Sequence, residues 1–165
     1  MLKIDCEYNF PGGGTTIESS PYLTEYLHQL AQARGGVGYE AFVLKYGRRF
    51  IATPRPKGVR KRTNKLCFQN AFALASRDPS YIYAEGWATN LAHFHHAWCV
   101  TRDGVVVDPT WEHPEVCEYF GVPFQLVYVA KTILAHNRSG TLPLRFNNVR
   151  PDEVDVTDIV EVLLP

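Results

Sequence analysis

The sequence predicts one α+β domain over residues 1–165, with N-terminal helices packed on a C-terminal antiparallel sheet. Two observations support this fold class. Apolar residues recur with helical spacing before Asp78, whereas short β-rich segments separated by Gly, Pro and Asp follow from Ser80 onward. Helices followed by strands are typical of α+β rather than of alternating βαβ units. A chain of 165 residues has the size of one ordinary domain and can bury a core without a disulfide or metal staple.

The composition indicates a globular protein with no charge-driven partner. Hydrophobic residues make up 45% of the chain, charged residues make up 21%, and the formal net charge is zero. This balance argues against nucleic-acid binding. The first residues, MLKIDCEYNF, carry acidic side chains and no long apolar run, so we expect no signal peptide. No segment has the length of a membrane span, and we therefore expect a cytoplasmic location and no membrane partner.

The first half of the chain is predicted to be helical apart from its loops. A helix is expected from Thr16 to Ala33, because its apolar residues share one face, and the glycines of RGGVG (34–38) end it. The segment YEAFVLKYG (39–47) fits a helix or a strand equally well. The segment 48–65 carries eight Lys and Arg residues, which favours a solvated loop and leaves open an anionic docking surface beside the site.

A core helix is predicted next, with Asn64 as its N-cap and its end at Asp78-Pro79. The strands expected after it are YIYAEGWAT (81–89), HHAWCV (95–100), VVVDPT (105–110), FQLVYVA (124–130) and, less clearly, DIVEVLL (158–164).

Cys67 stands in the first turn of that core helix. Unpaired N–H groups and the helix dipole favour a thiolate there, and the thiolate is the nucleophilic form of cysteine. On placement alone, a small cysteine buried at the start of a core helix is the favoured reading. Of the other cysteines, Cys99 is expected in the core, and neither Cys6 nor Cys117 has a feature that would activate it. All four cysteines are expected to be reduced, because their spacing fits no disulfide framework.

A base for Cys67 is sought among the histidines before and within HHAWCV. His93 and His95 are predicted to face one side of this strand and His96 the other, because strand side chains alternate. His96 shares its face with Trp98 and Val100. It is therefore the histidine expected in a fixed, partly dry environment.

The turn Arg102-Asp103-Gly104 decides whether Asp108 can reach His96. A two-residue turn at Asp103-Gly104 would place Asp108 opposite Cys99, on the wrong face. A three-residue loop ending in a left-handed Gly104 would place Asp108 opposite Trp98, diagonal to His96 on the same face. The sequence permits both turns.

The segments CFQNA (67–71) and HAWCVTRDGVVVDPTW (96–111) are similar to the transglutaminase-like branch of the papain-like cysteine enzymes. The resemblance covers about a third of the chain and implies a papain-like fold. By position, it implies that Cys67 is the nucleophile, His96 the base and Asp108 the orienting acid. It also implies an oxyanion hole formed in part by the Cys67 N–H. Asn64 is the candidate side-chain donor, and Asn64 and Trp98 are the candidate substrate-binding residues.

The function expected from this site is hydrolysis of a peptide or amide bond in a protein, peptide or small amide substrate, with no cofactor. Acyl transfer to an amine, or an inactive binding module of the same fold, remains open, as does the oligomeric state. A metal site formed by HFHH (93–96) with Cys99, His113 and Cys117 is the rival prediction. These residues have no familiar ligand spacing. Neighbouring strand residues also point to opposite faces of a sheet and cannot bind one ion together, so no metal is expected.

Overall fold

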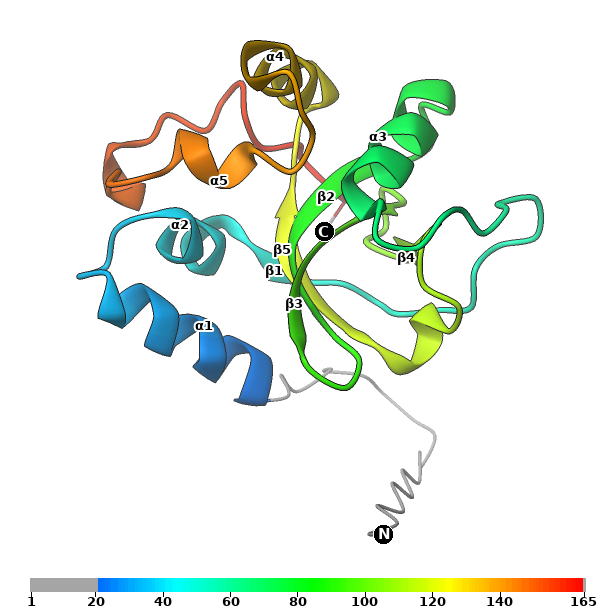
Figure 1. Cartoon of the computed structure of the whole chain (residues 1–165), viewed down its shortest axis with the longest axis horizontal. Helices are drawn as coiled ribbons and strands as arrows, with labels where there is room; N and C mark the ends of the chain where they lie inside the picture. Colours follow the sequence, from blue (N-terminus) through cyan, green and yellow to red (C-terminus); the bar gives the residue numbers. More distant parts are fainter. Residues whose placement is uncertain (1–20, 165) are drawn as a thin grey trace, which may run out of the picture.

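The computed structural model describes residues 21–164, an α+β fold with helices around an antiparallel five-stranded sheet (Figure 1). The helices are α1 (Pro21–Ala33), α2 (Tyr39–Tyr46), α3 (Cys67–Arg77), α4 (Leu126–His136) and α5 (Leu142–Arg145). The strands are β1 (Arg48–Arg49), β2 (Ile82–Thr89), β3 (His93–Val100), β4 (Val106–Val107) and β5 (Glu118–Pro123). Short 3-10 turns lie at η1 (Pro114–Val116) and η2 (Pro151–Glu153). The α+β fold class is therefore confirmed.

The strands lie in the order β1-β5-β2-β3-β4, and each neighbouring pair is antiparallel. One sheet face packs against the helices, with Tyr83, Trp87, Ala97 and Cys99 in the larger core cluster. The other face carries Trp98, Val100 and Tyr119, which belong to a second cluster with Phe50 and Trp111. Successive residues of β3 thus pack into the two core clusters in alternation.

The predicted helices form, and the undecided segment is a helix. In α1, Leu23 and Leu27 are fully buried on the predicted apolar face, and Gly35 and Gly36 beyond its end adopt left-handed φ values of 69° and 73°. The predicted start of this helix, 16–20, lies outside the described residues. The segment 39–47 forms α2, whose buried residues include Phe42 and Val43.

The prediction of a strand over FQLVYVA is wrong, because this segment begins helix α4. The helix continues to His136 and ends at Asn137, whose φ is 52°. A segment of seven mostly apolar residues has no periodicity that separates strand from helix, and here the continuation of the helix to His136 distinguishes them.

The strand β5 was not predicted, because Gly121 and Pro123 within it read as strand breakers. Yet β5 lies between β1 and β2, and Pro123 is its last residue. Gly121 is required by contact: a Cβ there would lie 2.6 Å from the Glu85 carbonyl oxygen and 2.8 Å from the Trp98 ring.

Two other predicted strands are shorter than expected. VVVDPT contains only the two-residue strand β4, and DIVEVLL contains only an isolated bridge between Val160 and Phe124. Among residues 21–164, no helix is long and apolar enough to cross a membrane.

Candidate functional site

The hairpin between β3 and β4 closes with the three-residue loop Arg102-Asp103-Gly104. Cys99 faces Val107 and Val100 faces Val106, so the same register places Thr101 opposite Val105 and Trp98 opposite Asp108. The Thr101 N–H donates to the Val105 carbonyl oxygen at 3.0 Å, and Gly104 adopts a left-handed φ of 77°. Of the two turns that the sequence permits, this is the one that brings Asp108 to the face of His96.

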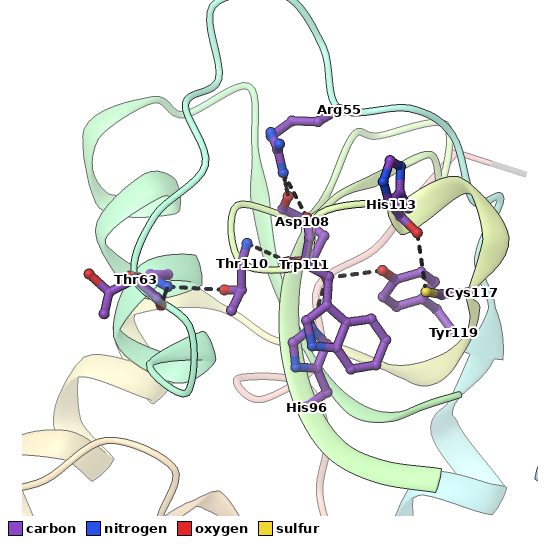
Figure 2. A network of polar contacts seen from close by, with 10 residues as sticks. Arg55, Thr63, His96, Asp108, Thr110, Trp111, His113, Cys117 and Tyr119 are labelled. Atoms are coloured by element: carbon purple, nitrogen blue, oxygen red, sulfur yellow. Dashed lines mark hydrogen bonds and ion pairs between the residues drawn. The ribbon is translucent and has the colours of Figure 1, made fainter. Parts of the chain in front are cut away.

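His96 and Asp108 form a buried hydrogen-bonded pair (Figure 2). The His96 Nε2–H donates to Asp108 Oδ2 at 2.8 Å, and the two side chains are 3% and 0% exposed. The Trp111 ring stacks on the imidazole with 4.1 Å between ring centroids. With Nε2 committed to Asp108, Nδ1 is the ring nitrogen available to another group.

Cys67 is that other group. It is the first residue of α3, is buried, and lies close enough to the His96 side chain to raise the pKa of that imidazole. The first N–H to bond within this helix is that of Asn70, which donates to the Leu66 carbonyl oxygen at 2.8 Å. The thiol therefore lies at a helix terminus where backbone N–H groups have no helical partner.

The prediction that Asn64 caps this helix is wrong. The N-cap is Leu66, without a side-chain hydrogen bond, and Lys65 adopts a left-handed φ of 66°. This left-handed residue breaks the helical path between Asn64 and Cys67. Cys67 still stands in the first turn, but loop geometry rather than a capping side chain sets the start of the helix.

The pKa of His96 reflects opposing influences. Burial, the largest of them, lowers the pKa, but the hydrogen bonds with Asp108 and Cys67 and the charges of both groups raise it to about 9. The ring is therefore protonated at neutral pH. The structure supports an imidazolium held between a carboxylate and a thiol.

Asp108 accepts four hydrogen bonds that hold it as a carboxylate. Oδ2 accepts from His96 and from the Tyr119 hydroxyl at 2.9 Å, and Oδ1 accepts from the N–H groups of Thr110 at 2.7 Å and Trp111 at 3.2 Å. Burial raises the pKa of Asp108, but these bonds and the His96 charge outweigh it, and the pKa is lowered. Burial and the Asp108 charge raise the pKa of Tyr119, so its hydroxyl stays a donor.

The basic segment before α3 holds the Asp108 loop in place. Arg55 donates to the carbonyl oxygens of Asp108 at 3.4 Å and Trp111 at 2.8 Å, as Figure 2 shows, and the Arg62 N–H donates to the Pro109 carbonyl oxygen at 2.7 Å. From α3, the Asn70 side-chain amide donates to the Thr63 carbonyl oxygen and to the Thr110 hydroxyl. This segment is therefore partly structural.

Tyr119 and Arg55 are support residues that sequence reasoning missed. Tyr119 belongs to the unpredicted strand β5, and Arg55 is one of eight basic residues in a segment read mainly as a solvated loop. Nothing local distinguishes either residue. Trp111 is the one supporting residue with a local sequence clue, because it directly follows the DPT motif at 108–110.

A pocket of about 720 Å³ opens over these residues. Cys67, His96, Thr110 and Trp111 line it, together with the following residues: Lys61, Asn64, Lys65, Phe68, Asn90, Leu91, Phe94, His95, Glu112 and His113.

The two candidate substrate-binding residues differ in placement. Asn64 is exposed and lines the pocket, so it is placed to contact a ligand. Trp98 is fully buried and does not line the pocket, so it lies away from the space that Asn64 faces. Trp98 shares the sheet face of His96 but lies two residues further along β3, inside the second core cluster, where Gly121 packs against its ring.

The other described cysteines do not line the pocket, and the rival metal ligands form no metal-binding group among the described residues. Cys99 donates to the Ala71 carbonyl oxygen, and burial raises its pKa; burial, with the Asp108 charge, also raises the pKa of Cys117 to about 11. Over residues 21–164, no group of three or more His, Cys, Asp or Glu side chains could hold a metal ion. Cys67, Cys99 and Cys117 are free thiols, and Cys6 lies outside the described residues.

No protein-family model matches this chain, and no curated protein or solved structure matches it either. The likeness to transglutaminase-like enzymes therefore rests on the residues of the chain itself.

Proposed function

We propose that this chain is a cysteine hydrolase that cleaves a peptide or amide bond through an acyl-enzyme on Cys67. The observation that carries the proposal is the meeting of Cys67 and His96 at one pocket, with the buried Asp108 carboxylate hydrogen-bonded to the imidazole from behind. A thiol nucleophile, its base and an orienting acid require this order of contacts. A transglutaminase-like member of the papain-like class is the accompanying proposal, because the helix that begins at Cys67 packs against the strand that carries His96.

In the acylation step, the Cys67 thiolate attacks the carbonyl carbon of the amide. His96, with a pKa of about 9, carries the proton that the leaving amine takes as the C–N bond breaks. Asp108 keeps its charge, because hydrogen bonds lower its pKa, and it stabilises the imidazolium through Nε2. The thioester and a neutral His96 remain.

The start of α3 supplies the groups suited to the oxyanion. Its first backbone N–H groups have no helical partner and lie beside the thiol, where a developing negative charge would be stabilised. The N–H of Cys67 is the main candidate. Asn64, on the pocket wall, is the candidate side-chain donor.

Alkylation of the thiols by iodoacetamide, followed across pH by mass spectrometry, tests the proposal. We expect Cys67 to be modified faster than the other thiols across this pH range, because the His96 imidazolium and the unpaired N–H groups at the start of α3 lie beside it. Cys99 and Cys117 should react slowly, since both are buried and burial raises the pKa of each.

His96→Gln is the informative variant, because the glutamine amide can still donate to Asp108 while the imidazolium is lost. Preferential labelling of Cys67 should disappear in it and persist in the control His93→Gln, which removes a histidine that does not line the pocket. Equal, slow labelling of all cysteines in the wild type would overturn the proposal. Preferential labelling without turnover of any acyl donor would favour the inactive binding module instead.

A further inference from the structure

The strand β3 carries a second histidine–carboxylate pair that the acylation step does not use. The Nε2 atom of His95 lies 2.9 Å from Glu85 Oε1, and the two side chains are 28% and 0% exposed. In the β2–β3 register, Trp87 faces His95 and Glu85 faces Ala97, so His95 and Glu85 are diagonal neighbours. His96 and Asp108 have the same diagonal relation on the opposite face of the sheet. Both histidines nevertheless line the same pocket.

Two side chains hydrogen-bond to the buried Glu85. The Tyr83 hydroxyl donates to Oε2, and burial followed by the Glu85 charge raises the pKa of both Tyr83 and Tyr39. Both tyrosines therefore keep their hydroxyl protons, and Tyr83 acts as a donor. A buried carboxylate without such partners would be very costly, so His95 Nε2–H and Tyr83 O–H are the groups that stabilise it.

This arrangement leaves one nitrogen of His95 for the pocket. Nε2 is committed to Glu85, and among the described residues none hydrogen-bonds to Nδ1. The ring is held by Phe68 at 5.0 Å and Trp87 at 5.3 Å between centroids, and Phe68 is the residue next to Cys67. A fixed imidazole with a free nitrogen, backed by a carboxylate and partly open to solvent, is suited to accept a proton.

His96 is less accessible to a second reactant. Its side chain is 3% exposed, Trp111 covers one ring face, and its contacts are Asp108 and Cys67. His95 is more open to the space through which a second reactant must enter. The two histidines are therefore suited to the two reactants: His96 to the thiol and His95 to the acyl acceptor.

Resting on the proposed function, we propose that His95, held by Glu85, is a further catalytic residue that takes the proton of the attacking water when the acyl-enzyme is hydrolysed. As the water oxygen bonds to the thioester carbonyl carbon, one water proton moves to His95 Nδ1. The carbonyl re-forms, the C–S bond breaks, and Cys67 leaves as a thiolate. The carboxylic acid product gives its proton to neutral His96, and His95 releases its proton to solvent.

The experiment separates acylation from deacylation with p-nitrophenyl acetate as the acyl donor and the full chain as the enzyme. In the wild type, a burst of p-nitrophenolate should report acetylation of Cys67, seen also by intact mass, and the slower steady state should report deacylation. In His95→Gln, whose amide can still donate to Glu85, the burst should be unchanged. The steady-state rate should fall by about 100-fold, the scale of lost general base catalysis.

Added imidazole provides a readout that a structural role would not change. It should restore deacylation in His95→Ala by at least about tenfold more than in the wild type, because it can supply the missing base in an open pocket. His93→Gln is the matched control: His93 lies on the same strand face, stacks on Tyr26 and does not line the pocket. Its burst and its steady state should match the wild type.

The other outcomes overturn the inference in distinguishable ways. A normal burst with a normal steady-state rate in His95→Gln would reject the role of His95 and leave the proposed function standing. A His95→Gln protein that does not fold, or that loses burst and steady state together without rescue by imidazole, would assign His95 to the scaffold. No burst in the wild type, or an equal burst in Cys67→Ala, would reject the proposed function and this inference with it.

Discussion

Asp108 accepts hydrogen bonds from the side chains of His96 and Tyr119 and from two backbone N–H groups, all while fully buried. Both carboxylate oxygens of Asp108 therefore face hydrogen-bond donors. An asparagine at this position would turn its side-chain NH2 group toward some of these donors and could not accept from them. The charge that holds the His96 imidazolium would be lost as well.

For Asp108→Asn, we predict a loss of turnover approaching about 10⁴-fold, by analogy with the orienting carboxylate of serine proteases. Tyr119→Phe is the comparison, because it removes one donor and keeps the buried ring; its turnover should fall far less. The measurement is steady-state hydrolysis of an activated acyl donor, with a thermal melt to verify folding. Equal losses in both variants would show that the site depends on packing rather than on the Asp108 charge.

Three site residues could be predicted from the sequence because each lies in a local motif. Cys67 stands at the start of a periodic helix, His96 on the apolar face of a strand, and Asp108 in the DPT motif, and the resemblance to transglutaminase-like enzymes supplies their roles because the turn before Asp108 left its face open. The supporting residues Tyr119 and Arg55 act across strands or loops far apart in sequence. Their partners could not be found without the tertiary structure.

At the level of elements, the β3–β4 hairpin sets the register of the site through Gly104. Its φ of 77° is left-handed, and a Cβ there would meet only ordinary contacts at 4.0 Å with Arg48 and Phe50. A substitution therefore tests conformation with little steric interference.

We predict that Gly104→Val lowers the free energy of unfolding by about 1–2 kcal/mol, whereas Gly104→Asn costs much less, because asparagine tolerates the left-handed region. Preferential alkylation of Cys67 should weaken with valine if the Asp108 register is disturbed. Urea melts and iodoacetamide labelling of both variants measure the two effects. Equal destabilisation by valine and asparagine would contradict the conformational explanation.

The strand β5 depends on the close approach of Gly121 to its neighbours. A Cβ there would lie 2.6 Å from the Glu85 carbonyl oxygen and 2.8 Å from the Trp98 ring. Since the nearest atom is backbone, the neighbouring strand would have to move.

We predict that Gly121→Ala destabilises the fold by about 3 kcal/mol, the upper part of the range for overpacking a core. The matched control is Gly36→Ala, where φ is 73° and nothing lies within 4 Å of the added Cβ. That control should cost only the conformational strain of a left-handed alanine, about 1 kcal/mol. Urea denaturation compares the two, and similar losses would argue against the steric role of Gly121.

The same elements show where sequence patterns fail. The glycine and proline of β5 are breakers in most strands, and the short apolar run at the start of α4 fits a strand as well as a helix. The close approach of β2 requires a glycine at position 121 of β5. Helix α4 continues past the apolar run and ends at Asn137, which adopts a left-handed φ.

Across the whole molecule, the buried His96–Asp108 pair links stability to pH. The pKa of His96 is raised from its ordinary value to about 9 in the folded chain, so its contribution is complete below the unfolded pKa. That contribution is lost as pH rises through about 9. The lowered pKa of Asp108 has the opposite sense, because its contribution is lost as pH falls through the folded value.

We predict that the melting temperature of the wild type falls as pH is raised from about 6.5 to about 9, the window set by the two pKa values of His96. His96→Gln should lack this part of the decline, because it has no proton to lose there. Thermal melts of both proteins at matched ionic strength make the comparison. A decline of equal size in the variant would assign the pH dependence to other groups.

The sequence by itself determined the fold class, the helices α1 and α3 and the two long strands, and it indicated Cys67, His96 and Asp108 as candidate site residues. These follow from local periodicity, turn chemistry and short motifs, which are properties of neighbouring residues. The tertiary structure alone decided the hairpin register, the support of Asp108 by Tyr119 and Arg55, and the meeting of His95 and His96 at one pocket. Each of these depends on which distant segments pack together, and no local pattern records that information.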